Sequence, residues 1–300
     1  MIYTVTLNPA IDYRVYAEDF IKEGATVKGV QGASSIGGKG INVSIVLKRL
    51  GIPSVASGIA AGLSGKMLGA GLSEEGIENR FVEASKGETR INVKILSGKG
   101  GNEKTTEING AGPVADDNDI NGVIRSLGDI NGNDTVVLSG SLPSGVKKDV
   151  YRRIISEAVL PKGARFAVDT CGEALIETLC LRPFLIKPNL SELAEIAGRT
   201  FENEEEIKAA GKELVEKGAC NVIVSMGGQG AMLLSDKGDY FRSRVCSEPA
   251  KDPVGAGDSM VAGFIAGLER GMSVGEAFEF ASKVSDYTAR CFGFPKEYPF

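Results

Sequence analysis

The alternation of strand and helix patterns is the feature that most constrains the fold. From residue 135 onward, short apolar segments alternate with helical patterns, and each segment ends in a polar or glycine-rich loop. We predict strands at 135–138, 166–168, 184–186, 221–224 and 231–234. Strands separated by helices favour a mostly parallel sheet with helices on its faces. The loops after these strands should then share one edge of the sheet, where α/β proteins bind ligands.

Composition and charge are typical of a globular domain in water. The chain is 42% hydrophobic and 24% charged, and no apolar run approaches the roughly 20 residues that cross a bilayer. No secretory signal is predicted, and five cysteines without a C-x-x-C pair are typical of reduced thiols. We therefore predict a cytoplasmic protein without a membrane partner. The net charge of −5 argues against nucleic acid as a partner.

The absence of histidine restricts the available chemistry. Ser–His–Asp and Cys–His nucleophile systems need an imidazole, as does histidine-ligated zinc. Any proton transfer must therefore be carried out by Asp, Glu, Lys, Tyr or Cys.

Residues 251–268, KDPVGAGDSMVAGFIAGL, combine small residues with a helix start. Backbone amides of Gly255, Ala256 and Gly257 can surround an anion, and the first helical turn adds unpaired donors and a positive dipole end. Asp258 would repel a bound phosphate, so its position makes sense if it faces a hydroxyl that loses a proton during attack. The alternative is that Asp258 only caps the helix.

Two early segments carry further candidates. Asp12 lies just beyond the predicted strand 2–7, on the side where ligands bind, although a turn-forming role would also explain it. In residues 35–43, SIGGKGINV, glycines can bring the backbone close to a ligand, Lys39 supplies a cation and Asn42 projects from the first helical turn. This spacing is not that of a Walker A motif. A flexible turn is the alternative.

A strand-like segment at 89–95 places three polar side chains on one face. Arg90, Asn92 and Lys94 share that face because strand side chains alternate with period two. Such a face could hold a phosphorylated ligand, or it could simply be exposed to solvent. A glycine-rich hairpin is predicted next, at 97–101.

Two later loops are candidates for the nucleotide side of a site. Lys187, Asn189 and Glu192 follow a strand, and their oxygens suit Mg²⁺, although an ordinary helix cap explains them too. The glycines of residues 225–230, SMGGQG, suggest close approach of a phosphate or a base. A tight β-hairpin explains them equally well.

Together these motifs resemble the ribokinase-like sugar kinases of the phosphofructokinase-B type. The resemblance covers nearly the whole chain and rests on the order of its motifs: an LTLNPAID-like start, GGKGIN, TRINVK, SGSLP, KPN-x-x-E, S-x-G-x-x-G and VGAGDSMVAG. It implies a single three-layer α/β/α domain over residues 1–300. The implied small β-sheet lid comes from insertions at about 13–34 and 86–110.

The resemblance also implies roles for individual residues. Asp258 would be the general base, and the amides of Gly255, Ala256 and Gly257 would stabilise the transferring phosphoryl group. The residues implied to bind the sugar are Asp12, Gly38, Lys39, Asn42, Arg90, Asn92 and Ser139. Those implied to bind the nucleotide are Lys187, Asn189, Ser225, Met226, Gly227, Gly228, Gln229, Gly230 and Gly257, with Asn189 and Glu192 at the metal.

The implied reaction is ATP-dependent phosphorylation of a ketohexose monophosphate. Fructose 1-phosphate is the first expectation, tagatose 6-phosphate the second, and fructose 6-phosphate is less favoured because its kinases in this branch are expected to have glycine where Lys39 stands. ATP and Mg²⁺ are the expected cofactors, a monovalent cation is compatible with the resemblance, and a homodimer through the lid is expected. The competing classes are a non-catalytic sugar-phosphate-binding protein and a kinase of a nucleoside or an unphosphorylated sugar.

Overall fold

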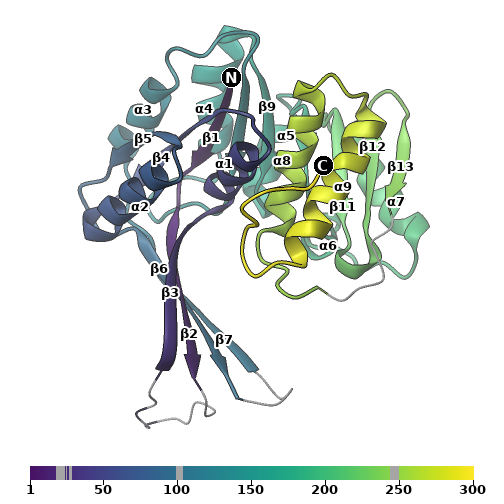
Figure 1. The fold of residues 1–300 in the computed structure, drawn as a ribbon. Helices are drawn as coiled ribbons and strands as arrows, with labels where there is room; N and C mark the ends of the chain where they lie inside the picture. The colour runs from purple at the N-terminus through teal and green to yellow at the C-terminus, as the bar shows by residue number, and fades with distance from the viewer. Residues whose placement is uncertain (18–23, 25, 27–28, 99–103, 244–249) are drawn as a thin grey trace.

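Two separate β-sheets organise the chain (Figure 1). The structure, a computed structural model, describes residues 1–17, 24, 26, 29–98, 104–243 and 250–300. Within these residues the larger sheet has nine strands in the order β13-β12-β11-β10-β9-β8-β1-β4-β5. Their bounds are β1 (Ile2–Thr6), β4 (Ser54–Ala60), β5 (Glu78–Glu83), β8 (Thr135–Ser139), β9 (Arg165–Asp169), β10 (Leu185–Ile186), β11 (Asn221–Ser225), β12 (Ala231–Ser235) and β13 (Tyr240–Ser243).

The larger sheet is mostly parallel, as the sequence predicted. Neighbouring strands from β5 to β11 all pair in parallel, whereas β12 pairs antiparallel with both β11 and β13. The edge strands β5 and β13 had no predicted counterpart, because ENRFVE and YFRS carry few apolar residues. An edge strand needs less apolar surface than a central one, so its pattern is weaker.

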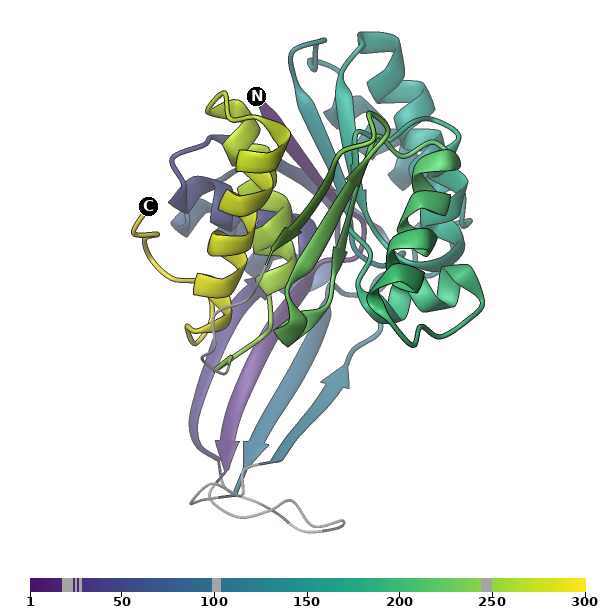
Figure 2. The ribbon, with the colours of Figure 1, turned by 90° about the vertical axis from the view of Figure 1, so that its right-hand side faces the viewer.

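Helices cover both faces of this sheet, which confirms the three-layer α/β/α arrangement (Figure 2). One face carries α3 (Asp117–Ser126), α4 (Val150–Ile154), α5 (Gly172–Leu179), α6 (Leu190–Ala197) and α7 (Glu204–Glu216). The other carries α1 (Lys39–Arg49), α2 (Gly62–Glu74), α8 (Ala256–Glu269) and α9 (Val274–Ala289). Strand side chains alternate between the two cores: Val136 and Leu138 enter the first, and Val137 enters the second. Among the described helices, none is long and apolar enough to cross a membrane.

The smaller sheet extends away from this body at the bottom of Figure 1. Its described strands, in the order β3-β2-β6-β7, are β3 (Gly29–Gly37), β2 (Ala10–Ala17), β6 (Arg90–Ser97) and β7 (Lys104–Asn109). They come from the two segments expected to form a lid. Parts of those segments, 18–23, 25, 27–28 and 99–103, lie outside the described residues, and so does most of the hairpin predicted at 97–101.

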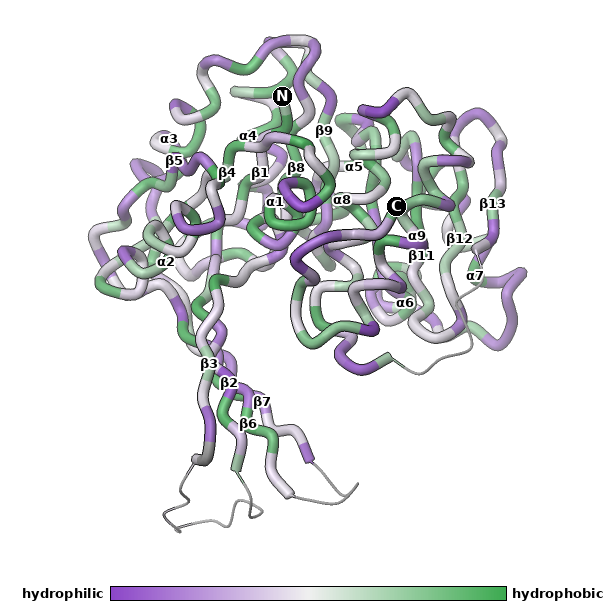
Figure 3. The backbone as a smooth tube through the Cα atoms, in the orientation of Figure 1, coloured by the Kyte–Doolittle hydropathy of each residue, from purple (hydrophilic) through white to green (hydrophobic). Residues whose placement is uncertain are grey.

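The small sheet has one polar and one apolar face. Its register pairs Asp12 with Asn92 and Arg14 with Lys94, so the side chains of these residues point the same way. The intervening residues, Tyr13 and Val93 among them, face the opposite side. Figure 3 shows the resulting alternation of hydrophilic and hydrophobic residues along these strands. The predicted shared face of Arg90, Asn92 and Lys94 is therefore present.

Candidate active site

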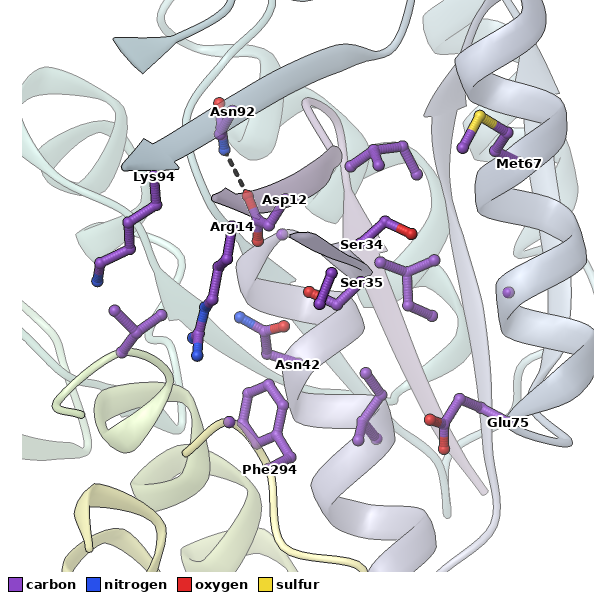
Figure 4. Close-up of a pocket in the computed structure, with 18 of the residues that line it drawn as sticks. Asp12, Arg14, Ser34, Ser35, Asn42, Met67, Glu75, Asn92, Lys94 and Phe294 are labelled. Carbon is purple, nitrogen blue, oxygen red and sulfur yellow. Dashed lines mark hydrogen bonds between the residues drawn. The ribbon is translucent and has the colours of Figure 1, made fainter. Parts of the chain in front are cut away.

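A cavity of about 1030 Å³ lies between the polar face of the small sheet and the body. Its walls come from the small sheet, from α1 and α2, and from the C-terminal segment that carries Phe294 (Figure 4). Six of the residues predicted to bind a sugar line it, namely Asp12, Gly38, Lys39, Asn42, Arg90 and Asn92. Segments far apart in the sequence thus converge on one space.

The first turns of two helices meet beside this cavity. Asn42 in α1 donates a hydrogen bond of 2.7 Å from Nδ2 to Oδ2 of Asp258 in α8. Burial raises the pKa of Asp258 to about 6, and the nearby negative charge of Asp169 adds to this shift. The hydrogen bond from Asn42 and the charges of two lysines oppose it. A carboxylate with such a pKa is deprotonated near neutral pH yet basic enough to accept a proton.

A buried carboxylate that the sequence analysis did not select lies beneath this pair. Asp169, at the end of β9, is 2% exposed, and its Oδ1 lies 3.1 Å from Lys39 Nζ and 3.6 Å from Lys187 Nζ. Burial raises the pKa of Asp169, but the charges of Lys187 and Lys39 outweigh that effect and hold the pKa below its ordinary value. The position of Asp169 at a strand's carboxyl end was a usable signal.

Asp169 neutralises two cations at once. Lys187 is only 5% exposed, so its ammonium group needs a counterion close by. Lys39 also approaches Oε1 of Glu192, at 3.7 Å. Burial lowers the pKa of Lys39, but the three carboxylates Asp169, Glu192 and Asp258 together raise it above its ordinary value. Lys39 is therefore charged.

The small residues that open α8 are required by their surroundings. Gly255 has a φ of 81°, and a side chain at this position would overlap the ring of Phe294. A Cβ at Gly257 would lie 3.2 Å from Lys187 Nζ. The start of α8 is therefore bare backbone beside a lysine, which is the arrangement predicted for an anion site.

The GGKG segment joins β3 to α1, and its glycines lie in close contact with neighbouring residues. A side chain at Gly37 would overlap the carboxylate of Asp12, and one at Gly38, where φ is 119°, would lie 2.9 Å from Thr6. These glycines let β3 lead directly into α1 against the end of β1. Lys39 and Asn42 are thereby directed at the site.

The wall of the cavity that the small sheet forms carries a cation, Arg90. Asn92 donates a 2.8 Å hydrogen bond to Asp12, as Figure 4 shows, whereas Arg90 has a buried Nε with no hydrogen-bond partner in the described ranges. Burial lowers the pKa of Arg90, and Asp12 partly offsets this. Within the described part of the chain, Arg90 has no ion pair. An anion entering the cavity could supply one.

Ser139 does not lie at the cavity. It is fully buried at the end of β8, where its backbone carbonyl accepts a 3.0 Å hydrogen bond from Tyr151. Its hydroxyl has no hydrogen-bond partner among the residues that the structure describes. This location gives no support for direct contact with a sugar.

The KPN loop has the geometry of a helix cap. Asn189 Oδ1 accepts from the backbone N–H of Glu192, and Glu192 Oε2 accepts from that of Asn189, at 2.9 and 2.8 Å. Ser225 lies alongside, since its N–H donates to the carbonyl of Pro188. The two loops predicted to hold a nucleotide are therefore neighbours.

Residues 225–230 form a tight β-hairpin turn between β11 and β12, the alternative that the sequence left open. The turn contains a short 3₁₀ segment, η3 (Gly227–Gln229), and Met226 is buried. Gly230 is needed because a side chain there would overlap the carbonyl of Ser243. No atom of the described residues would lie within 4 Å of a side chain at Gly227 or Gly228. Those two glycines leave room for a ligand.

The donor set fits a magnesium ion that keeps most of its own water. Among the described residues, no group of three or more His, Cys, Asp or Glu side chains could hold a metal alone. Within the described residues, Asp169 Oδ2 is buried without a hydrogen-bond partner, and Glu192 Oε1 has only Lys39 nearby, at 3.7 Å. Free carboxylate oxygens can accept hydrogen bonds from metal-bound water, the usual arrangement for Mg²⁺ at phosphates.

Comparison with known proteins defines the class. The family model described as pfkB family carbohydrate kinase matches residues 4–295. A 1-phosphofructokinase of Bacillus subtilis is 44% identical over 96% of this chain and 92% of its own, and a D-tagatose-1-phosphate kinase of Bacillus licheniformis is 33% identical with the same coverage. Phosphofructokinase-2 from Escherichia coli, solved with potassium, superposes with a TM-score of 0.90 at 28% identity, over 97% of this chain and 93% of its own.

These likenesses identify a phosphotransferase that acts on a sugar hydroxyl. The chain belongs to the pfkB family of carbohydrate kinases. Arabidopsis thaliana ribokinase, 22% identical with a TM-score of 0.76 over 98% of this chain and 93% of its own, shares the fold. The expected ribokinase-like architecture is thus confirmed.

Proposed function

We propose that this protein transfers the γ-phosphoryl group of ATP to fructose 1-phosphate and forms fructose 1,6-bisphosphate. The observation that carries the proposal is the placement of two groups at one cavity. Asp258 is hydrogen-bonded to Asn42, which lines the body wall, and Arg90, a partly buried cation that has no ion pair among the described residues, lies at the small-sheet wall. A phosphorylated sugar could satisfy Arg90 while presenting a hydroxyl to Asp258.

Arg90 would hold the phosphate that the substrate already carries. A neutral sugar would leave its guanidinium without an ion pair, which is unfavourable for a partly buried cation. The Asp12–Asn92 pair would accept and donate hydrogen bonds to sugar hydroxyls. This arrangement argues against a nucleoside or an unphosphorylated sugar as acceptor.

Asp258 would take the proton of the attacking hydroxyl. Amides at the start of α8, together with Lys187 beside Gly257, would stabilise the charge that develops on the transferring group. The open turn at Gly227 and Gly228 would accept the nucleotide. Mg²⁺, when bound, neutralises phosphate charge; Asp169 and Glu192 would hold it through water, and Asn189 would act as the cap that orients Glu192.

The choice of ketose is supported by the relatives. Four curated relatives that are at least 34% identical to this chain are described as 1-phosphofructokinases. The tagatose enzyme is described as a kinase of the 1-phosphate. The second candidate is therefore a tagatose phosphate. The relatives favour its 1-phosphate over the 6-phosphate that the sequence suggested.

Initial rates of ADP formation with Mg-ATP test the proposal. Fructose 1-phosphate, tagatose 1-phosphate, tagatose 6-phosphate and fructose 6-phosphate would be compared. We expect kcat/KM for fructose 1-phosphate to exceed that of both 6-phosphates by about a hundredfold, because a misplaced phosphate leaves Arg90 unpaired. A preference for either 6-phosphate would contradict the substrate, and repeating the assay without K⁺ would show whether a monovalent cation is needed.

We further propose a homodimer that uses the apolar face of the small sheet as its interface. Tyr13, Ile91 and Ile108 on that face are 42%, 48% and 58% exposed, which is unusual for side chains of this size on a single sheet. Light scattering should give twice the chain mass of 31.5 kDa. Ile108→Asp should give a monomer, whereas Ile176→Asp, at an exposed site on α5, should not. A monomeric wild-type protein would contradict this interface.

A further inference from the structure

Asp252 joins the body to the small sheet. It precedes α8, is buried, and its backbone belongs to the body, because the N–H groups of Lys251 and Asp252 both donate to the carbonyl of Ala289 at the end of α9. Its side chain accepts a 3.1 Å hydrogen bond from the N–H of Val254. The residue is therefore fixed on one side by the helix that packs against α8.

The carboxylate of Asp252 points to the small sheet. Arg14 Nη2 lies 2.7 Å from Oδ2, and Lys94 Nζ lies 4.0 Å from Oδ1. Arg14 and Lys94 are cross-strand partners on β2 and β6, on the polar face that lines the cavity. Lys94 is also held by Glu107 of β7, at 3.0 Å. One buried carboxylate thus links the described body to three strands of the small sheet.

The residues that follow Asp252 build the start of α8. Val254 lines the cavity, Gly255 lies under the ring of Phe294, and the N–H of Ala256 donates to the carbonyl of Pro253. Only five residues lie between Asp252 and Asp258. A displacement of Asp252 would therefore be passed along a short, tightly constrained segment to the base and to the amides beside it.

We propose that Asp252 is a positioning residue, through which Arg14 and Lys94 fix the start of α8 relative to the sheet that holds the sugar. The inference rests on the proposed function, since it assigns the small sheet to the acceptor and the start of α8 to phosphoryl transfer. Hydroxyl and phosphoryl group must be aligned closely for reaction, and an error of about 1 Å can cost a hundredfold in rate. The Arg14–Asp252 pair sets that alignment.

Two other roles for the pair make different predictions. A merely structural ion pair would change stability and leave the kinetic constants of the folded protein unaltered. A direct contact between Arg14 and the sugar phosphate would raise KM on loss of Arg14, while Asp252 would matter less. If the pair instead positions the start of α8, loss of either residue should lower kcat and leave KM for the sugar phosphate little changed.

The experiment compares Arg14→Gln, Asp252→Asn, the double variant and Arg14→Lys with wild type. We expect kcat to fall about tenfold in each single variant, KM to change less than about twofold, and the double variant to be no worse than the singles, because the two residues act as one unit. Arg14→Lys should recover most of kcat. Arg152→Gln, which removes an exposed ion pair with Glu177 on the body, is the matched control.

Amide hydrogen exchange of the peptide 253–259 gives a readout without substrate or nucleotide. Arg14→Gln and Asp252→Asn should speed its exchange about tenfold over Arg152→Gln, since the start of α8 loses its tether. The inference would be overturned by unchanged exchange in Arg14→Gln. It would also be overturned if the loss of kcat in the double variant equalled the product of the two single losses, or if KM rose without a fall in kcat. If the wild-type protein phosphorylates none of the sugar phosphates, the proposed function fails, and the exchange experiment still decides whether the tether exists.

Discussion

The side-chain amide of Asn42 donates a 2.7 Å hydrogen bond to the carboxylate of Asp258, across 216 positions of sequence. This bond joins the first turn of α1, which directly follows strand β3 of the small sheet, to the first turn of α8. It also lowers the pKa of this carboxylate, against the raising effects of burial and Asp169, and the resulting pKa is about 6. The pair therefore sets both the position and the basicity of the proposed general base.

The pH dependence of kcat/KM should follow Asp258. Activity should fall as the pH decreases through about 6, because the protonated carboxyl cannot accept a proton. Asn42→Ala removes an interaction that favours the charged form, so its acid limb should move to higher pH. A limb that stays in place in this variant, measured over pH 5 to 9, would show that another group titrates.

Asp169→Asn should shift the acid limb of kcat/KM in the direction opposite to that expected for Asn42→Ala. The negative charge of Asp169 raises the pKa of Asp258, so its removal should lower that pKa and extend activity to lower pH. Since Asp169 also orders the lysines, overall kcat should fall as well. Opposite shifts in Asn42→Ala and Asp169→Asn would be difficult to explain unless Asp258 is the titrating residue.

Asp169→Asn should also destabilise the fold. The substitution leaves the buried Lys187 and the nearby Lys39 without their shared counterion. Breaking a buried ion pair on one side costs about 3–5 kcal/mol, and urea unfolding would measure the loss. Asp117→Asn, which removes only an exposed partner of Arg153, is the control and should cost less than about 1 kcal/mol. Similar losses in both variants would refute the proposed counterion role.

Arg90→Ala should raise KM for the sugar phosphate about thirtyfold or more with little change in kcat, since a charged hydrogen bond to phosphate is lost in ground and transition states alike. Arg80→Ala, at an arginine paired with Asp129 on the body, is the matched control. An unchanged KM in Arg90→Ala would remove Arg90 from the phosphate site.

Gly255→Ala should destabilise the start of α8 for two separable reasons. The positive φ disfavours any side chain by about 1 kcal/mol, and the methyl group would overlap the Phe294 ring. In the double variant with Phe294→Ala, the overlap should be relieved and only the cost of the positive φ should remain. A double-mutant cycle of unfolding free energies checks this, and purely additive losses would mean that Phe294 does not constrain Gly255.

Features that depend on residues close together in the chain could be predicted from the sequence. Strand and helix alternation fixed the class of fold, because it depends on periodicity within each segment. The face shared by Arg90, Asn92 and Lys94 followed from the period of a strand. The assignment of Asn42 and Asp258 to one active site followed only from the family resemblance, since spacing alone left helix caps and turns as alternative explanations.

Features that depend on packing between distant segments were not predictable. Asp169 ends a strand like many acidic residues, and only the convergence of Lys39 and Lys187 identifies it as a counterion. The contact between Phe294 and Gly255 and the pairing of Arg14 with Asp252 join segments separated by tens to hundreds of residues. The placement of Ser139 away from the cavity likewise depends on the burial of β8.

The most direct test of the account is ³¹P NMR of a reaction containing Mg-ATP, fructose 1-phosphate and either wild-type protein or Asp258→Asn. The account predicts that the wild-type protein produces ADP and a second phosphomonoester on the sugar in equal amounts. It predicts that Asp258→Asn, nearly isosteric with wild type, slows this reaction by about 10³-fold or more without a comparable change in KM. ADP formed without a new sugar phosphate, or an Asp258→Asn variant as fast as wild type, would contradict it.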